Sequence, residues 1–331
     1  MIGTAPALEY DGAEGPGVSS YAESDKKFMS EITLETEQAV LERYASASAK
    51  KEEALCCAVD YDPKYLEVIP DEILERDYGC GDPSQYVAEG DVVLDLGSGG
   101  GKICYIASQV VGPAGTVIGI DFNPPMIALA EHYQADIARA IGWDNVDFRF
   151  GRIQDLKTDY RKLDAYLREN PVRDWETLRQ FERYRDRLVA TAPLVATGSI
   201  DVIVSNCVLN LVDMDDRRML FDEMFRTLAT DGRAAISDIV ADREVPEALR
   251  RDPELWSGCL SGAFEEQAFL VAFADAGFRN IRIDKRDDAP WKVIDGIEFR
   301  SVTVLAEKPD GGAGEVPVYG ESRPAAAGRC C

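Results

Sequence analysis

Three cysteines lie in short, distinctive segments that are far apart in the chain. Cys80 lies in YGCG, Cys207 in SNCVLNL and Cys259 in LWSGCLSG. Structural zinc sites use closely spaced C-x2–4-C pairs, and the chain contains no C-x-x-C. Three dispersed thiolates suit instead a soft trivalent ion with a lone pair, because soft centres prefer sulfur ligands. Trivalent arsenic, As(III), is the leading candidate for an ion bound by these three residues.

A glycine-rich turn predicts a site for a nucleoside. In the run VVLDLGSGGGK, Gly97 and Gly99 occupy the first two positions of the dinucleotide fingerprint G-x-G-x-x-G, and Lys102 occupies the third. Asp121 ends the next predicted strand, where a carboxylate can accept hydrogen bonds from both ribose hydroxyls. The missing third glycine, together with Asp95 just before the turn, favours S-adenosylmethionine. A nicotinamide dinucleotide is the alternative.

The overall composition argues against several classes of function. The formal net charge is −24, so neither nucleic acid nor an anionic membrane surface is an expected partner. A single histidine, His132, leaves little room for nucleophile–histidine or zinc-hydrolase chemistry. The sequence shows neither a secretory signal nor a long apolar span, so we expect a cytoplasmic protein. Its eight cysteines are then expected to be mainly reduced thiols.

Alternating apolar strands and amphipathic helices predict an α/β fold with a doubly wound, mostly parallel, Rossmann-like sheet. Helices are expected before this sheet, at residues 31–54 and 70–78, and within it, after the glycine turn and at residues 126–140. The strands are expected at residues 92–96, 116–120, 146–150, 200–204 and 234–237, with closing strands at 281–283 and 301–305.

The chain is expected to form one domain, residues 31–308, between two loose ends. Residues 1–30 are interpreted as a mobile arm, and residues 309–331 as a short flexible C-terminal tail that ends in two cysteines. A charged insertion at residues 156–196 separates the third and fourth strands, and its apolar spacing predicts a pair of amphipathic helices. This helical insertion is either a peripheral cover or dimer surface, or a lid over the substrate.

With these motifs, the chain resembles the arsenite S-adenosylmethionine methyltransferases of the class I methyltransferase superfamily. The resemblance covers about residues 35–155 and 198–308. It rests on the three cysteine segments, the LDLGSG turn, GID at the end of the second strand and SD in the fifth. It implies that Cys80, Cys207 and Cys259 hold As(III). It also implies that Cys56 or Cys57 takes part in a disulfide cascade.

The turn and the resemblance together predict the residues that bind S-adenosylmethionine. Tyr44 is expected to pack on the methionine end of the cofactor. Asn206 is expected either to contact the methionine carboxylate or to cap its own loop. The predicted cofactor-binding residues are Tyr44, Asp95, Gly97, Ser98, Gly99, Asp121, Phe122, Asn123, Met126, Arg152, Ile153 and Asn206.

The predicted reaction is an in-line methyl transfer to thiolate-bound As(III), which gives methylated arsenicals. It oxidises arsenic, so a thiol pair must return two electrons, and an external thiol reductant such as thioredoxin or glutathione resets the enzyme. Because thiolates bind arsenic, we expect affinity to fall at acid pH. The alternatives are a methyltransferase for another small molecule or metalloid, and a non-catalytic arsenite binder.

Overall fold

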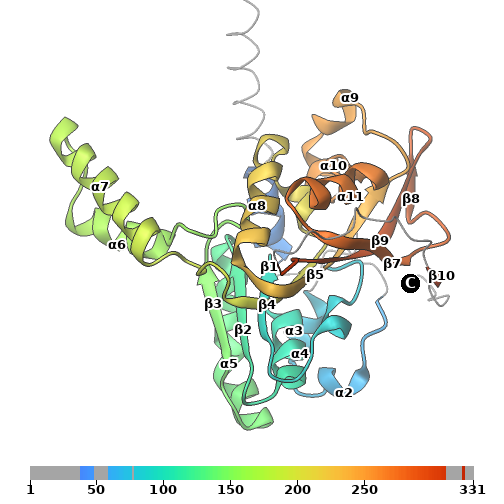
Figure 1. Ribbon diagram of the computed structural model, residues 1–331, viewed down its shortest axis with the longest axis horizontal. Coiled ribbons are helices and arrows are strands. Elements are labelled where there is room, and N and C mark those ends of the chain that lie inside the picture. Colours follow the sequence, from blue (N-terminus) through green and yellow to red (C-terminus); the bar gives the residue numbers. More distant parts are fainter. Residues whose placement is uncertain (1–37, 48–58, 77, 311–322, 325–331) are drawn as a thin grey trace, which may run out of the picture.

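The computed structural model describes residues 38–47, 59–76, 78–310 and 323–324 of the chain (Figure 1). A ten-stranded sheet forms its centre, with the order β10-β7-β9-β5-β4-β1-β2-β3, while β6 pairs with β5 and β8 with β9. The strands are β1 Val92–Leu96, β2 Thr116–Asp121, β3 Val146–Phe150, β4 Ile200–Asn206, β5 Leu228–Ala241, β6 Phe264–Glu265, β7 Arg279–Arg286, β8 Lys292–Ile294, β9 Ile297–Glu307 and β10 Arg323–Pro324.

The parallel half of the sheet follows from its apolar strands. β1 pairs in parallel with both β2 and β4, and its residues are almost entirely buried, as in a strand covered on both faces. The order β3-β2-β1-β4-β5 changes direction between β1 and β4, so a crevice opens at the carboxyl ends of these two strands. The predicted α/β, mostly parallel fold is confirmed.

The other half of the sheet contains the antiparallel pairs, all of them made by β9. The predicted closing strands are present as β7 and β9, but β9 lies between β5 and β7 and runs antiparallel to both. The short strand β8, which the sequence did not suggest, forms a hairpin with the start of β9. The sheet is therefore mixed, with β9 as its antiparallel insertion.

Helices cover both faces of the sheet and enclose two apolar clusters. Val93 and Val117 pack with α4 and α5 on one face, and Leu94 and Ile118 pack with α8 and α11 on the other, which reflects the two-residue period of a strand. A helical segment also spans residues 38–47. The helices are α2 Pro63–Leu66, α3 Asp71–Glu75, α4 Lys102–Val111, α5 Pro124–Ile141, α6 Tyr160–Glu169, α7 Trp175–Thr191, α8 Arg217–Thr227, α9 Glu247–Arg250, α10 Pro253–Ser257 and α11 Glu266–Asp275, with short 3-10 turns at Pro83–Tyr86, Leu209–Leu211 and Met214–Asp216.

Helices α6 and α7 form a hairpin that projects away from the sheet (Figure 1). We call residues 158–193 the helical arm. Its two helices pack against each other through stacked rings of Tyr166 and Tyr184, whose centroids are 4.0 Å apart. The base of the arm is closed where the backbone N–H of Leu194 donates to the carbonyl of Lys157 at 3.0 Å.

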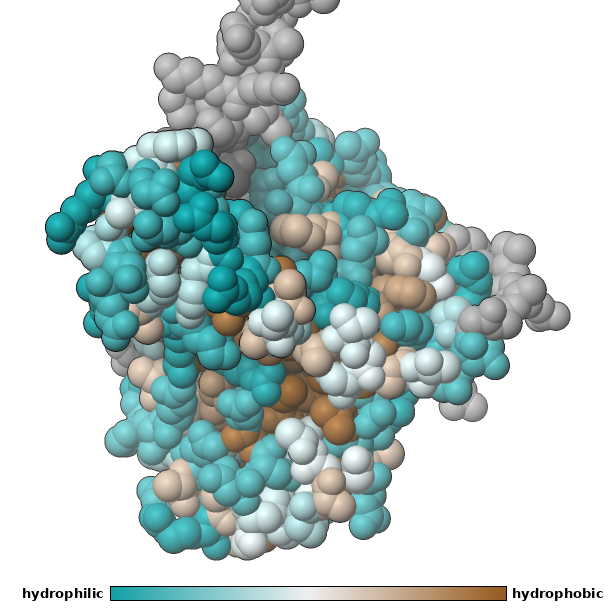
Figure 2. Space-filling model, turned by 60° about the vertical axis from the view of Figure 1, so that its left-hand side comes forward, coloured by the Kyte–Doolittle hydropathy of each residue, from teal (hydrophilic) through white to brown (hydrophobic). Residues whose placement is uncertain are grey.

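The surface is mainly hydrophilic on the face that Figure 2 shows, and apolar surface gathers near the centre of that face. Within the described part of the chain, no helix combines the length and apolarity that crossing a membrane requires. The predicted arm at 1–30, Cys56, Cys57 and nearly all of the predicted tail lie outside the described residues.

Candidate functional site

The glycine turn between β1 and α4 depends on residues without a side chain. Gly97 and Gly99 have φ angles of 75° and 51°, in the left-handed region that favours glycine. A Cβ on Gly97 would lie 2.4 Å from a methyl carbon of Val208, so the close approach of the loop after β4 also requires glycine. Gly101, with φ of 89°, starts α4, and a Cβ there would meet the Phe148 ring at 2.8 Å. Close helix–sheet packing, the function of the third fingerprint glycine, is thus achieved at Gly101.

Asp121 at the end of β2 organises the cofactor side of the crevice. Its carboxylate accepts from the backbone N–H of Gly99 at 2.9 Å and of Asn123 at 2.8 Å. Burial raises the pKa of Asp121, while these donors oppose that shift by stabilising its charge. Two buried oxygens in the same region, Ser98 Oγ and Asn123 Oδ1, have no hydrogen-bond partner among the described residues. Such atoms are uncommon in folded proteins, and a polar ligand such as a nucleoside would satisfy them.

A cleft at the carboxyl ends of β1, β2 and β4 brings the predicted cofactor residues together. Every predicted cofactor-binding residue lines it, and so does Cys207. No residue of the helical arm lines this cleft, so the structure gives no support to a lid formed by the arm. The lining includes the predicted residues Tyr44, Asp95, Gly97, Ser98, Gly99, Asp121, Phe122, Asn123, Met126, Arg152, Ile153 and Asn206.

Sequence reasoning missed several other lining residues. Those that follow β4 could have been found, because the residues just beyond the carboxyl end of a strand line the crevice of a doubly wound sheet. Those from the segments before β1 could not, because only packing brings them to the cleft. The missed residues are Val40, Arg76, Tyr78, Ile103, Val208, Leu211, Val212, Asp213 and Asp216.

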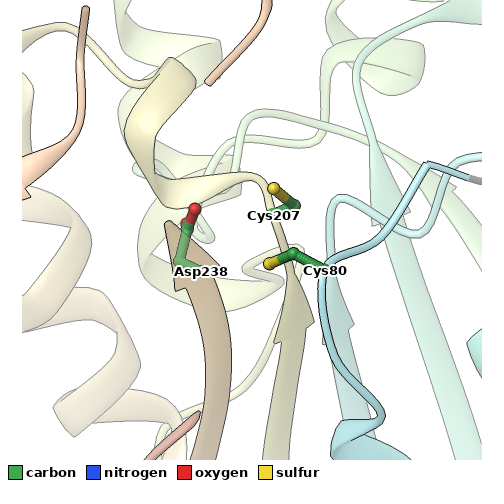
Figure 3. A group of neighbouring side chains, drawn as sticks. All are labelled: Cys80, Cys207 and Asp238. Carbon is green, nitrogen blue, oxygen red and sulfur yellow. The ribbon is translucent and has the colours of Figure 1, made fainter. Parts of the chain in front are cut away.

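The three cysteines meet beside this cleft. The sulfurs of Cys80 and Cys207 and a carboxylate oxygen of Asp238 all lie within 4.8 Å of one another (Figure 3). The thiol of Cys259 donates to the backbone carbonyl of Cys207 at 3.0 Å. All three side chains are buried and belong to one cluster, and all three are free thiols. The fold therefore brings together three thiols from three separate segments.

Two of these cysteines have a strained backbone. Cys207 has a φ angle of 62° and Cys259 one of 60°, so both adopt the left-handed conformation despite carrying a Cβ. This conformation costs on the order of 1 kcal/mol per residue. The cost at Cys207 is offset by a hydrogen bond from its N–H to the carbonyl of Ser237 at 2.8 Å. Strained residues of this kind cluster at functional sites.

Buried polar groups surround the thiols. Asp238 accepts from the backbone N–H of Leu209 at 2.9 Å and from the amide of Asn210 at 2.7 Å. Burial nevertheless raises the pKa of Asp238 to about 7. Arg217 is also buried, and burial lowers its pKa to about 10. The sequence did not assign Asp238 a role, because its place beside the thiols depends on the pairing of β5 with β4.

Cys80 and Cys207 have raised pKa values, for different reasons. Burial raises the pKa of Cys80. Hydrogen bonding to Cys259 and then to Cys80 raises the pKa of Cys207 well above its usual value. The hydroxyl of Tyr44 lies 3.9 Å from the Cys259 sulfur. Burial also raises the pKa of Tyr44. At neutral pH, Cys80 and Cys207 are therefore mainly protonated.

Comparisons with known proteins agree with this geometry. A family model described as a methyltransferase domain matches residues 88–277. An arsenite methyltransferase from Halobacterium salinarum is 32% identical over 240 residues, which are 70% of this chain and 50% of that protein. Another, from Aquipseudomonas alcaligenes, is 33% identical over 257 residues, which are 76% of this chain and 61% of that protein. The chain thus spans between half and two thirds of the length of these curated relatives.

A solved structure is similar as well. The arsenic(III) S-adenosylmethionine methyltransferase from Chlamydomonas reinhardtii has 27% sequence identity and a TM-score of 0.58, with 75% of this chain and 74% of that chain covered. The matched family model spans the glycine turn, two of the three cysteine segments and the strands that position them. The chain therefore belongs to the methyltransferase-domain family and has the class I S-adenosylmethionine-dependent fold.

Proposed function

We propose that this chain is an arsenite methyltransferase, which transfers methyl groups from S-adenosylmethionine to As(III) held by Cys80, Cys207 and Cys259. One observation carries the proposal: three buried thiols from distant segments converge beside a cleft that has the features of a nucleoside site, and one of them, Cys207, lines it. The arsenite methyltransferases that resemble the chain support the same substrate.

The cleft fits S-adenosylmethionine. The glycine turn gives the cofactor close access to the backbone, Asp121 is the acceptor for its ribose hydroxyls, and the unpartnered oxygens of Ser98 and Asn123 are available for further hydrogen bonds. When bound, this cofactor supplies a methyl group on a positively charged sulfur. The residues of the chain bind and orient the two reactants, and such alignment lowers barriers by ~7–11 kcal/mol when it is good.

The thiols bind arsenic by exchange. Arsenous acid, As(OH)3, reacts with three thiols to give a trithiolate and three waters, so each departing hydroxide takes up one thiol proton. With S-adenosylmethionine bound in the cleft, its methyl group would pass to the arsenic lone pair as an As–C bond, and S-adenosylhomocysteine would be the other product. Arsenic carries no proton, so this step needs no general base.

Methyl transfer formally oxidises arsenic by two electrons. We propose that Cys80 and either Cys56 or Cys57 return these electrons and become a disulfide. A small dithiol or a thiol reductant of the thioredoxin or glutathione type then reduces that disulfide by exchange. The cycle requires a reducing compartment, and we propose the cytoplasm, in keeping with the free thiols of Cys80, Cys207 and Cys259.

Speciation of the products tests the proposal. Full-length protein is incubated with methyl-labelled S-adenosylmethionine, arsenite or methylarsenite, and a dithiol reductant, and the arsenic species are separated over time. We expect labelled methylated arsenicals that require both protein and reductant. Arsenite bound without any methylated product would favour the non-catalytic binder. Transfer of label only to other acceptors would favour a different methyltransferase.

A further inference from the structure

Asn206 makes three hydrogen bonds to the loop that carries Cys80. Asn206 is the last residue of β4 and directly precedes Cys207. Its Oδ1 accepts from the backbone N–H of Cys80 at 2.9 Å and of Gly81 at 3.1 Å. Its Nδ2 donates to the carbonyl of Gly81 at 2.7 Å and to the hydroxyl of Tyr61 at 3.1 Å. This use of Asn206 agrees with a loop-holding role rather than a contact with the methionine carboxylate.

Two other side chains also hydrogen-bond to the loop. Tyr61, which accepts from Asn206, donates its hydroxyl to the carbonyl of Gly81 at 3.1 Å. Ser301 on β9 donates to the carbonyl of Cys80 at 2.7 Å. Asn206 is the shared partner, because it bonds to two backbone N–H groups, a carbonyl and Tyr61 at once. Its amide therefore connects the Cys80 loop to the end of β4.

The sequence of the loop leaves room for this amide. A Cβ on Gly79 would lie 2.1 Å from Nδ2 of Asn206, closer than any real contact. The amide of Asn206 can bond to the loop only because residue 79 has no side chain. The φ angle of Gly79 lies outside the left-handed region. Alanine at this position would therefore disturb the contact with Asn206 rather than the backbone conformation.

The three thiols are not held equally. The side chains of Cys259 and Cys80 both hydrogen-bond to that of Cys207, and the Cys259 thiol also donates to the Cys207 carbonyl. Only the backbone of Cys80, by contrast, is attached to the Cys207 segment through the side chain of Asn206. Losing this amide would loosen one thiol and leave the pair of Cys207 and Cys259 together.

We propose, on the basis of the function proposed above, that Asn206 is a positioning residue that holds Cys80 as the third thiol and so sets the preference between arsenicals. Arsenous acid exchanges three hydroxides and uses three thiols. An organoarsenical of the form R–As(OH)2 exchanges two and is satisfied by two thiols. Asn206 therefore favours the three-thiol substrate.

The test compares the affinities of arsenite and phenylarsine oxide, a two-thiol probe, for the Asn206→Ala protein. We expect arsenite affinity to fall by about tenfold or more, because the third thiol is no longer preorganised, while phenylarsine oxide affinity changes by less than about threefold. Cys80→Ser calibrates the complete loss of the third thiol. An equal loss for both arsenicals, or no loss for arsenite, would overturn the proposal.

A double-mutant cycle checks that the effect passes through this contact. Gly79→Ala should reproduce the selective loss of arsenite affinity, because its methyl group displaces the amide of Asn206. In the Gly79→Ala/Asn206→Ala protein the clash is gone, so the double variant should bind arsenite no worse than Asn206→Ala alone. Additive losses of arsenite affinity would contradict a role for the contact between Asn206 and the Cys80 loop. If Asn206→Ala fails to fold, Gly79→Ala still tests the proposal.

Two controls separate this inference from the proposed function. S-adenosylhomocysteine affinity is measured for each variant, and a loss as large as that for arsenite would assign Asn206 to the cofactor rather than to the Cys80 loop. Wild-type protein that binds no arsenite would refute the proposed function itself. Wild-type protein that binds arsenite, with an unaffected Asn206→Ala variant, would refute the positioning role alone.

Discussion

At the scale of single residues, the arrangement distinguishes thiols that face the proposed reaction from one that does not. Cys207 lines the cleft and lies among three clustered thiols, whereas Cys104 is fully buried within α4 and donates to Asp95 at 3.2 Å. These surroundings assign the two thiols different roles.

Replacing Cys207 with serine should abolish arsenic methylation. The oxygen of serine is a poor ligand for soft As(III), and the site would lose its central thiol. We expect turnover to fall by at least about a hundredfold, as for removal of a group that aligns a reactant. Labelled-product assays measure the rate, and calorimetry with S-adenosylhomocysteine should give an unchanged affinity.

Cys104→Ala is the matched control for this prediction. The change removes a buried sulfur from α4, so it should lower stability by about 1 kcal/mol through the small cavity that it creates. Methylation should continue. Similar losses of activity in both variants would mean that the assay reports thiol removal in general.

The raised pKa values of Cys80 and Cys207 change the expected pH dependence. Ordinary thiolates would predict weaker binding at acid pH. Because both groups start as thiols and their protons leave with hydroxide as water, arsenite affinity should instead stay nearly flat from about pH 6 to 8. The association rate should rise by up to roughly tenfold per pH unit, because the reactive thiolate fraction grows below the pKa. Stopped-flow binding measures both, and an affinity that declines steeply below pH 7 would contradict the prediction.

At the scale of elements, the helical arm is attached at a narrow base. The N–H groups of Leu194 and Val195 donate to the carbonyls of Lys157 and Leu156, at 3.0 and 2.8 Å. This short antiparallel contact resembles the closed end of a hairpin. The arm also meets α5 through an ion pair between Arg161 and Glu131 at 2.9 Å. Because both of its side chains are exposed, that pair contributes at most about 1 kcal/mol.

Excising the arm should therefore leave the cleft intact. Residues 159–192 are replaced by a short Asn-Gly turn, which joins the two backbone segments that pair at the base of the arm. We expect folded protein, and affinity for S-adenosylhomocysteine within about threefold of wild type, because the arm contributes no residue to the cleft. Calorimetry and circular dichroism check this. If the variant folds but does not bind S-adenosylhomocysteine, the result would support the alternative in which the arm is a lid.

At the scale of the whole molecule, the cofactor cleft and the thiol cluster are two sites on one sheet edge. A ligand that binds only the folded state stabilises it, by about 2.7 kcal/mol at a concentration one hundred times its Kd. For a domain of this size, S-adenosylhomocysteine should raise the Tm by about 5 °C.

Thermal unfolding with each ligand should separate the two sites. Arsenite should also raise the Tm of wild-type protein, and Cys207→Ser should lose that shift while keeping the shift from S-adenosylhomocysteine. A Cys207→Ser protein that lost both shifts would show that the two sites are not independent. Scans of both proteins under reducing conditions give the answer.

The sequence by itself determined the parts of this protein that are encoded locally. The apolar runs set the bounds of β1 and β3, the glycine turn identified the cofactor side, and the three cysteine segments identified the candidate ligands, because period, turn chemistry and side-chain type are local properties. Tertiary structure decided the rest. It inserted β9 antiparallel between β5 and β7, set Ser237 opposite Asn206, and so brought Asp238 and the Cys80 loop to Cys207. Strand order and register join residues more than a hundred positions apart, and no local pattern records which of them meet.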